Sequence, residues 1–475
     1  MTPGACVAAA IGLLADIEAA HAPADDIVGT YFRRHRFAGV KDRAAISAHV
    51  YAVLRHRAAL DWWVARRGDG LAVDARRRML AALMLIEHWT PVAIDKACDG
   101  DQFRPTPLDA AERKLVAGLV GEEPVTPNMP ANVRGNYPEW LEPHLTAALG
   151  RDLAREMAAA QEPAQLDLRT NLLKSDREAV RAALARDGVS AARTKLSPLG
   201  LRVFERIPLS TLETFRNGHV EVQDEGSQLA ALLVAARPGM RVVDFCAGAG
   251  GKTLALAAAM DNRGHLIACD IKERRLERAT ERLRRAGASI VQRKPLESAR
   301  DPWVKRHARS FDRVLVDAPC TGTGTWRRNP DSKWRLTPAD LDELTALQAE
   351  ILDSAARLVK GGGRLIYVTC SLLREEDEVQ IERFLAGHPE FTLLPIGRIW
   401  RETVGGECPA SGAMLRLTPA RHGTDGFFVA VLERAPEPKK VKKPAEALEE
   451  ALEPASEQEE PAPALTPFPP ADTVE

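Results

Sequence analysis

The chain has 475 residues, of which 45% are hydrophobic and 28% charged, so it should form two or three globular domains. Its net charge of −1 hides a basic body, because residues 435–475 carry ten acidic residues and four lysines (−6), which leaves +5 for residues 1–434. The seven cysteines are sparse and include no C-x-x-C pair, which argues against a disulfide framework and against a metal site of the zinc type.

Residues 1–130 are predicted to be all-helical, because apolar residues recur at helical spacing through residues 7–17 and 46–63. The apolar stretch at residues 5–15 lacks the basic flank of a signal peptide. No stretch reaches the roughly 18 apolar residues that span a bilayer. We therefore expect a cytoplasmic protein that does not bind a membrane.

Arginines are frequent in this helical region. They are Arg33, Arg34, Arg36, Arg55, Arg57, Arg66, Arg67, Arg76, Arg77 and Arg78. Any one of them is explained by a solvated helix face. Taken with the basic body, the set equally fits an auxiliary RNA-binding surface.

Three further segments are expected along the chain. Prolines at residues 124–130 end the helical region, and residues 140–235 mix short strands with a helix, which predicts a small α+β module. Residues 236–434 alternate strands and helices, as in a doubly wound α/β sheet. Residues 435–475 are rich in Pro, Ala, Glu and Lys and are predicted to be disordered. Within the small module the expected elements are strands at 166–169 and 202–204 and a helix at 176–187.

A strand, a glycine turn and a helix start are predicted over residues 242–253. Gly248, Gly250 and Gly251 allow the backbone to turn sharply and to approach a ligand closely. The next predicted strand ends at Asp270, 26 residues after Asp244. An acid at that point is suited to hydrogen bonds with ribose hydroxyls.

Three kinds of cofactor site compete for this turn. A phosphate-binding loop would need glycine where Cys246 stands, and a dinucleotide fingerprint would need glycine where Thr253 stands. The D-x-x-x-G-x-G spacing of Asp244, Gly248 and Gly250 best fits S-adenosylmethionine. A purely structural glycine turn remains the alternative.

Two cysteines follow predicted buried strands. Cys320 ends the run Asp-Ala-Pro-Cys after apolar residues 314–316, and Cys370 follows apolar residues 365–368. Ligands of open α/β sheets bind outside the carboxyl ends of the strands, so both thiols should open onto one cleft. By contrast, Cys98 and Cys269 are expected to be inert core residues.

Such thiols beside a methyl donor suit chemistry on a pyrimidine. Carbon 5 of the ring is a poor nucleophile until a thiolate adds to carbon 6 and pushes electron density onto carbon 5. Carbon 5 can then accept the methyl group, and loss of its proton with expulsion of the thiol completes the cycle.

These motifs together resemble the Nop/Sun family of RNA 5-methylcytosine methyltransferases. The matching segments are residues 243–253, Asp270, residues 317–324 and residues 369–371, supported by Arg327, Pro330, Trp334 and residues 423–428. The helical N-terminus resembles the NusB-like domain of the bacterial rRNA small-subunit methyltransferase B branch. The resemblance implies a Rossmann-like class I methyltransferase sheet at residues 236–434, preceded by a helical NusB-like domain and the α+β module.

By this resemblance, Cys370 is the nucleophile, Cys320 assists product release, and Asp317 hydrogen-bonds the cytosine edge. DNA cytosine methyltransferases use the cysteine of their Pro-Cys motif instead, so the assignment rests on the family. The residues expected to hold S-adenosylmethionine are Cys246, Ala247, Gly248, Ala249, Gly250, Gly251, Lys252, Asp270 and Asp317.

The predicted activity is methylation of cytosine carbon 5 in RNA, most naturally ribosomal RNA, by a monomer that needs no metal. The alternatives are a tRNA cytosine methyltransferase, a catalytically idle RNA-binding or assembly factor, and a methyltransferase of protein or small molecules. The chain departs from the family at Ala249, usually Pro, and at Asp377, usually Asn. It also has the basic stretch 292–297 where the family tends to place an acid.

Three local expectations concern the surroundings of the site. Residues 326–328 and 333–335 interleave basic and aromatic side chains that could grip RNA. A helix capped by Thr337 should run to Lys360 and stop at the glycines 361–363. The arginines between positions 274 and 285 are expected to be surface charges.

Overall fold

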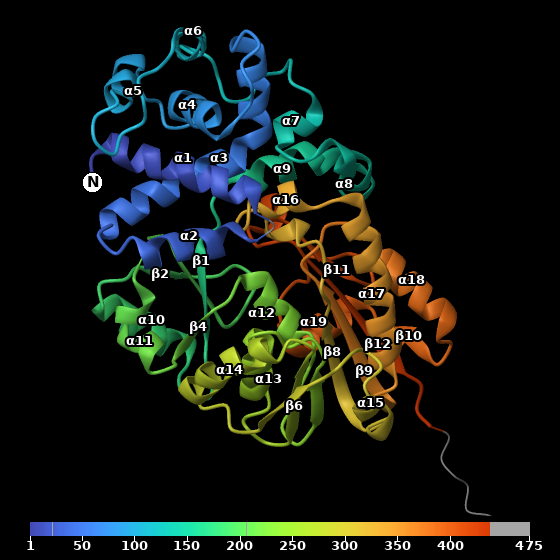
Figure 1. Cartoon of the computed structure of the whole chain (residues 1–475). Coiled ribbons are helices and arrows are strands. Elements are labelled where there is room, and N and C mark those ends of the chain that lie inside the picture. Colours follow the sequence, from blue (N-terminus) through green and yellow to red (C-terminus); the bar gives the residue numbers. More distant parts are fainter. Residues whose placement is uncertain (21, 206, 438–475) are drawn as a thin grey trace, which may run out of the picture. The chain divides into compact units, whose positions relative to one another are not determined.

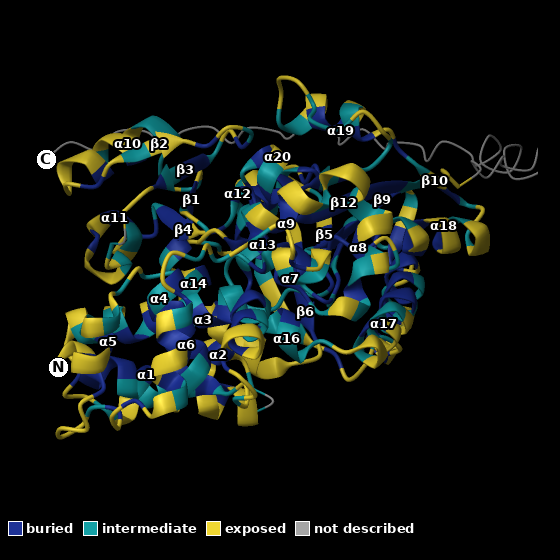
Figure 2. Cartoon of the chain, turned by 90° about the horizontal axis from the view of Figure 1, so that it is seen from above, coloured by how far each residue is buried: buried dark blue, intermediate teal, exposed yellow. Residues whose placement is uncertain are grey.

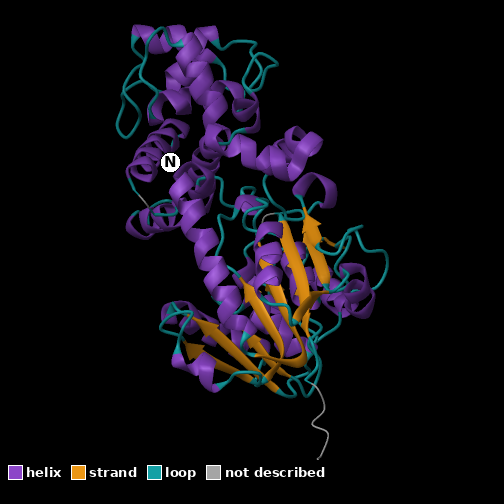
Figure 3. Cartoon of the chain, turned by 90° about the vertical axis from the view of Figure 1, so that its right-hand side faces the viewer, coloured by secondary structure: helices purple, strands orange, loops and turns teal. Residues whose placement is uncertain are grey.

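The computed structural model describes residues 1–20, 22–205 and 207–437 (Figure 1). The tail predicted to be disordered therefore lies almost entirely outside the described residues. In chain order, helices come first, a small sheet second and a large sheet last. Figure 3 shows the strands gathered below the helical region.

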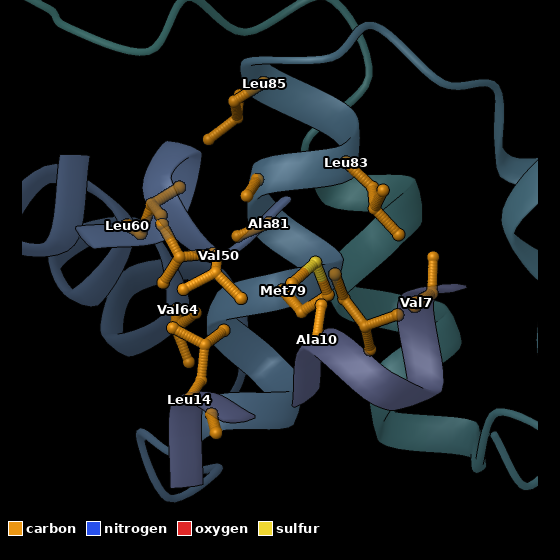
Figure 4. Packing of buried hydrophobic residues seen from close by; sticks show 14 of the residues in the cluster. Val7, Ala10, Leu14, Val50, Leu60, Val64, Met79, Ala81, Leu83 and Leu85 are labelled. Carbon is orange, nitrogen blue, oxygen red and sulfur yellow. The ribbon is translucent and has the colours of Figure 1, made fainter. Parts of the chain in front are cut away.

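The N-terminal region is helical, as predicted. Its core is formed where α1, α3 and α4 pack, with Val7, Leu14, Val50 and Met79 fully buried (Figure 4). The helices are α1 (Pro3–Ala19), α2 (Ala24–Arg34), α3 (Val40–Arg67), α4 (Ala75–Leu85), α5 (Pro91–Ala97) and α6 (Ala110–Gly118). The chain leaves this region through α7 (Ala131–Gly135), η1 (Glu139–Leu141), α8 (Glu142–Leu149), η2 (Gly150–Asp152) and α9 (Leu153–Gln161).

The small module is an antiparallel sheet in the order β2-β3-β1-β4. Its core residues, such as Leu168, Val180 and Leu201, are fully buried. The predicted strand at 202–204 begins two residues earlier and leaves out Phe204, which is exposed. The elements are β1 (Leu166–Thr170), α10 (Arg177–Arg186), β2 (Ala191–Arg193), β3 (Gly200–Val203), η3 (Leu209–Thr211), α11 (Glu213–Arg216) and β4 (Val220–Val222).

The large sheet has the order β10-β12-β9-β8-β5-β6-β7, with β11 paired to β12, within the described residues. Strands β5 to β9 run parallel, and β10, β11 and β12 are antiparallel additions. The α/β fold class is thereby confirmed. The strands are mostly buried, whereas α10 and α18 carry exposed residues (Figure 2). The elements are α12 (Glu225–Leu232), β5 (Arg241–Asp244), α13 (Gly251–Ala259), β6 (His265–Asp270), α14 (Glu273–Ala286), β7 (Val291–Pro295), α15 (Pro302–Arg306), β8 (Phe311–Asp317), η4 (Thr323–Thr325), α16 (Ser332–Arg335), α17 (Pro338–Ala356), β9 (Val359–Thr369), α18 (Glu378–Gly387), β10 (Phe391–Leu393), α19 (Ile396–Thr403), β11 (Leu415–Leu417), α20 (Pro419–His422) and β12 (Phe427–Arg434).

The helix α17 begins as predicted but ends early. Thr337 caps it through a reciprocal capping box with Asp340. The helix then stops at Ala356, and the glycines 361–363 lie inside β9 instead of ending the helix. A Cβ on Gly363 would lie 2.9 Å from the carbonyl oxygen of Phe311, so a close approach of β8 and β9 explains that glycine.

The basic and aromatic segment 326–335 does not form the predicted RNA-gripping surface. Trp326 and Lys333 are buried, and the indole N–H of Trp334 donates to the carbonyl oxygen of Leu54 at 2.8 Å. Lys333 Nζ donates to the carbonyl oxygen of Arg55 at 3.3 Å. This segment therefore joins the helical region to the large sheet, which local sequence does not reveal.

Candidate active site

The thiols of Cys320 and Cys370 meet at the carboxyl ends of β8 and β9. Their Sγ atoms lie 3.4 Å apart, although 50 residues separate them in the chain. The two strands are parallel neighbours, with Asp317 opposite Val368, so both chains leave the sheet at the same edge. The two thiols therefore lie together at one edge of the sheet, and their opening onto a cleft stays a prediction.

The environment of Cys320 keeps its thiol neutral. The hydrogen bond with Cys370 and burial raise the pKa of Cys320 well above its ordinary value, with a smaller contribution from Glu376. At neutral pH, Cys320 therefore holds a proton next to the sulfur of Cys370.

Glu376, which the sequence analysis did not identify, holds the Cys320 loop in place. Its Oε1 accepts from the backbone N–H of Thr321 at 2.8 Å and from Gln348 Nε2 at 2.9 Å. The same amide of Gln348 also donates to the carbonyl oxygen of Pro319 at 3.0 Å. Both neighbours of Cys320 are thus fixed. An acid six residues after Cys370 was the available signal for Glu376, but nothing local marked Gln348.

Three backbone segments stack beside the thiols. The N–H of Gly324 donates to the carbonyl oxygen of Cys370 at 2.9 Å, and that of Gly426 donates to Gly324 at 2.8 Å. A Cβ on Gly324 would lie 2.5 Å from the carbonyl oxygen of Gly426. Only glycine permits this approach, so the loops after β8 and β9 are locked to the start of β12.

Residues 246–252, the glycine loop, lead from β5 into α13, and the last two of them, Gly251 and Lys252, are the first residues of that helix. Gly248 and Gly250 have φ values of 55° and 80°, a conformation that favours glycine. Asp270 Oδ2 accepts from the N–H of Gly248 at 2.9 Å, and Oδ1 accepts from the N–H of Lys272 at 2.7 Å. The carboxylate of Asp270 therefore fixes the glycine loop to the end of β6. Within the glycine loop, Cys246, Ala247 and Ala249 are partly exposed.

Lys252 links the glycine loop to the thiol strand. Its Nζ donates to Asp317 Oδ2 at 2.8 Å, and the side chain is nearly buried. Burial disfavours the charged amine, but the Asp317 carboxylate outweighs it and raises the pKa of Lys252. Lys252 is therefore charged and holds the Asp317 carboxylate in place. Next to the loop, burial raises the pKa of Asp244 to about 7. Cys246 is partly exposed as a residue, but desolvation of its thiol, together with the nearby Asp244 and Asp317, raises the pKa of that thiol well above its ordinary value.

The arginines of α14 are not all surface charges, contrary to the sequence-based expectation. Arg282 and Arg285 both pair with the buried Glu221 of β4. The remaining arginines, Arg274, Arg275, Arg278 and Arg284, are exposed. Two of the six thus connect the small module to the large sheet.

The described residues contain no group of three or more His, Cys, Asp or Glu side chains arranged to hold a metal ion. No helix among them combines the length and the apolar character that crossing a bilayer requires.

Comparison with known proteins identifies the family. The family model described as 16S rRNA methyltransferase RsmB/F matches residues 231–433, and the ferredoxin-like domain of RsmF/B-like methyltransferases matches residues 137–210. The probable ribosomal RNA small subunit methyltransferase B of Synechocystis sp. is 31% identical over 419 residues, covering 83% of this chain and 92% of that protein. The chain belongs to the RsmB/F methyltransferase family.

Other relatives agree with that membership. The ribosomal RNA small subunit methyltransferase B of Xanthomonas campestris pv. campestris is 31% identical, covering 83% of this chain and 90% of its own. The solved structure of PH0851 matches with a TM-score of 0.73 and 28% identity over 91% of this chain and 99% of that one. A methyltransferase homolog protein from Pyrococcus horikoshii matches with a TM-score of 0.56 and 27% identity, over 65% and 100% of the two chains. The resemblance to the Nop/Sun family is thereby confirmed.

Proposed function

We propose that this chain transfers a methyl group from S-adenosylmethionine to carbon 5 of a cytosine in small-subunit ribosomal RNA. The 3.4 Å approach of Cys320 Sγ and Cys370 Sγ at the sheet edge carries the proposal. Covalent activation of a pyrimidine and its reversal can use two adjacent thiols, one to attack the ring and one to return a proton. Ribosomal RNA is favoured over tRNA because the relatives are named for the ribosomal small subunit.

The glycine loop fits S-adenosylmethionine. A Cβ on Gly248 would meet no atom within 4 Å, so the loop has open space at its crest. Asp270 uses both carboxylate oxygens for backbone N–H groups, yet each oxygen keeps a lone pair for a ribose hydroxyl. Bound S-adenosylmethionine supplies an electrophilic methyl group. Residues 246–252 and Asp270 would hold it, with Asp317 at the side nearest the thiols.

In the proposed mechanism, Cys370 Sγ forms a bond to carbon 6 of the cytosine. The electron pair of the carbon 5–carbon 6 double bond moves toward carbon 5, which becomes the nucleophile. Asp317, held by the charged Lys252, is positioned to bond the cytosine edge and stabilise the protonated ring. After carbon 5 has gained the methyl group, its proton passes to water, the Sγ–carbon 6 bond breaks with its electron pair on sulfur, and the carbon 5–carbon 6 double bond returns.

The neutral thiol of Cys320 supports its role in release. Its proton lies within hydrogen-bond reach of Cys370 Sγ, and a protonated thiol is a poor nucleophile. Cys320 is therefore suited to protonate the departing sulfur of Cys370. The assignment of the attack to Cys370 rests on the resemblance to the family. A cytosine must leave its helix to reach this position, so the substrate is an unpaired or flipped base.

We also propose the division of labour among the segments. Residues 236–434 carry the chemistry, residues 140–235 form a module beside it, and residues 1–130 form a NusB-like domain that contributes to RNA binding. The exposed arginines of α2 and its following turn, Arg33, Arg34 and Arg36, support the last assignment.

The two thiols are separated by an adduct-trapping experiment on the full chain. Cys370→Ala should abolish both methyl transfer and any covalent RNA adduct. Cys320→Ala should methylate once and then stall with RNA attached, a species that survives denaturing electrophoresis. An adduct found only with Cys370→Ala would assign the attack to Cys320. Methyl transfer without an adduct in either variant would exclude the covalent mechanism.

A further inference from the structure

Two arginines from outside the glycine loop hold its carbonyl groups. Arg282 of α14 donates through Nη1 to the carbonyl oxygen of Ala249 at 2.7 Å. Arg169 of β1 donates through Nη1 to the carbonyl oxygen of Gly251 at 2.9 Å. The loop is therefore fixed from behind by charged donors at two of its seven residues.

Both arginines are in turn anchored in the small module. Glu221 Oε2 accepts from Arg282 Nη2 at 3.0 Å and from its Nε at 3.3 Å. Gln223 Oε1 accepts from Arg169 Nη1 at 2.6 Å. Arg169 and Glu221 stand opposite each other in the β1–β4 pair, and both are nearly fully buried. Buried charges of this kind are rare in proteins unless they are paired.

The hydrogen bonds from Arg169 and Arg282 control the direction of the amide groups at the start of α13. A peptide unit is planar and trans, so fixing the carbonyl of Gly251 also fixes the N–H of Lys252, which points the opposite way. The first N–H groups of a helix have no partner within the helix and are available to a ligand. Arg169 and Arg282 therefore set how the turn between β5 and α13 presents its donors.

We propose that the small module is part of the cofactor site, with Glu221 and Arg282 acting as positioning residues for the glycine loop. The module does not serve merely as a spacer between the helical region and the large sheet. This inference rests on the proposed use of the glycine loop for S-adenosylmethionine. Because the module lies outside residues 246–252, removing its contacts should weaken cofactor binding without touching the thiols.

Arg282→Met tests the inference in the full chain. Its side chain is about one quarter exposed, at 27%, so methionine can replace its length without leaving a cavity. Affinity for S-adenosylhomocysteine, measured by titration calorimetry, should fall about tenfold, as expected for losing charge-assisted hydrogen bonds. The KM for S-adenosylmethionine should rise similarly, whereas kcat and the KM for RNA should stay within about twofold. If Arg282 only supported the fold, its loss would not raise the KM for S-adenosylmethionine while leaving kcat and the KM for RNA nearly unchanged.

The matched control is Arg278→Met. Arg278 lies one helical turn before Arg282 on the same flank of α14 and is exposed, but no contact joins it to the glycine loop among the described residues. The affinity of Arg278→Met for S-adenosylhomocysteine should equal that of the wild type. Glu221→Gln should weaken binding less than Arg282→Met, and the double variant should be no weaker than Arg282→Met alone, because the two act through one contact.

Equal affinities of Arg282→Met and Arg278→Met for S-adenosylhomocysteine would overturn the inference. Strictly additive losses of binding free energy in the variant that combines Glu221→Gln with Arg282→Met would do the same. Arg282→Lys keeps a donor for the Ala249 carbonyl, so partial rescue by it would confirm that position and not fold is affected. If the wild-type chain itself fails to bind S-adenosylhomocysteine, the proposed function falls along with the inference. Wild-type binding with an unaffected Arg282→Met removes the inference alone.

Discussion

The carboxylate of Glu376 accepts the backbone N–H of Thr321 at 2.8 Å, so the loop after β9 holds the loop after β8. Thr321 Oγ1 donates to the other oxygen of the same carboxylate at 2.5 Å. Glu376 is fully buried and touches no part of the glycine loop among the described residues. Its contribution to the site is therefore to fix where the Cys320 thiol lies relative to Cys370.

Replacing Glu376 with alanine should affect both stability and turnover. The variant leaves the buried Thr321 N–H without its acceptor and deprives the Gln348 amide of one of its two acceptors, which costs about 2 kcal/mol in the free energy of unfolding. Methylation should fall at least tenfold because Cys320 is no longer held. Urea denaturation and a methyl-transfer assay measure the two effects. Glu376→Gln keeps an acceptor for the Thr321 N–H and the Gln348 amide, so it should retain more stability and more methylation than Glu376→Ala. A Glu376→Ala variant that matches the wild type in both measurements would contradict the positioning role.

Replacing Asp270 with alanine should weaken binding of S-adenosylhomocysteine by about 1–3 kcal/mol. The carboxylate both orders the glycine loop through Gly248 and is the proposed partner of the ribose. Asp270→Asn should fall between the wild type and alanine, because the amide keeps one acceptor oxygen. Calorimetric titration gives the affinities. Glu277→Ala, an exposed acid on α14, is the control for the change in charge, and equal affinities for all variants would refute the assignment.

Lys333 should make stability depend on pH. Burial and the nearby Arg55 lower the pKa of Lys333 to about 7, whereas an unfolded lysine titrates near its ordinary pKa of 10.5. Between about pH 7 and pH 10 the unfolded chain therefore binds more protons at this position. The free energy of unfolding should rise with pH across that window, and this contribution should be flat below it.

Lys333→Met tests that dependence because methionine fills the same space without a titrating group. The difference in unfolding free energy between wild type and variant, from urea titrations at several pH values, should change in favour of the wild type as pH rises. Lys305→Met, at an exposed position, should follow the wild-type curve. Parallel curves for wild type and Lys333→Met would show that the amine is charged when folded.

Neutralising Arg33, Arg34 and Arg36 together should weaken RNA binding. For each phosphate that the variant no longer neutralises, the slope of log affinity against log salt should become shallower by about one, because counterion release drives such binding. Filter binding of a small-subunit rRNA fragment over a salt series measures the slope. Arg113→Gln with Lys114→Gln is the control, since both cations are exposed but already ion-paired within the helical region. An unchanged slope in the triple variant would show that Arg33, Arg34 and Arg36 do not bind RNA phosphates.

The residues around the thiols can be predicted because their placement follows from strand order. Cys320 and Cys370 each end an apolar run, and neighbouring parallel strands finish at one edge of a sheet. Asp270 and the glycine loop obey the same rule, at the ends of β6 and β5. The capping box of Thr337 and Asp340 is local in sequence, so it too is predictable.

What cannot be predicted depends on partners far away in the chain. Glycine is common both after a helix and inside a closely packed strand, so the prediction for the glycines 361–363 is wrong. Trp334 and Lys333 have the composition of an RNA-binding segment, yet their partners are backbone carbonyls 280 and 278 residues earlier. Arg282 similarly finds Glu221 across a boundary between sheets. Single-sequence patterns contain no information about such pairings.

The stacking of Gly324 against Gly426 has a consequence for how the protein is made. During synthesis both cysteines leave the ribosome long before Gly426 does, and β9 then has an open edge that only β12 will cover. Until the last strand is inserted, the Cys320 and Cys370 loops lack Gly426 as their third backbone partner. Over that interval the uncovered strand edge favours aggregation, so we expect chaperones that shield strand edges to raise the yield of the folded protein.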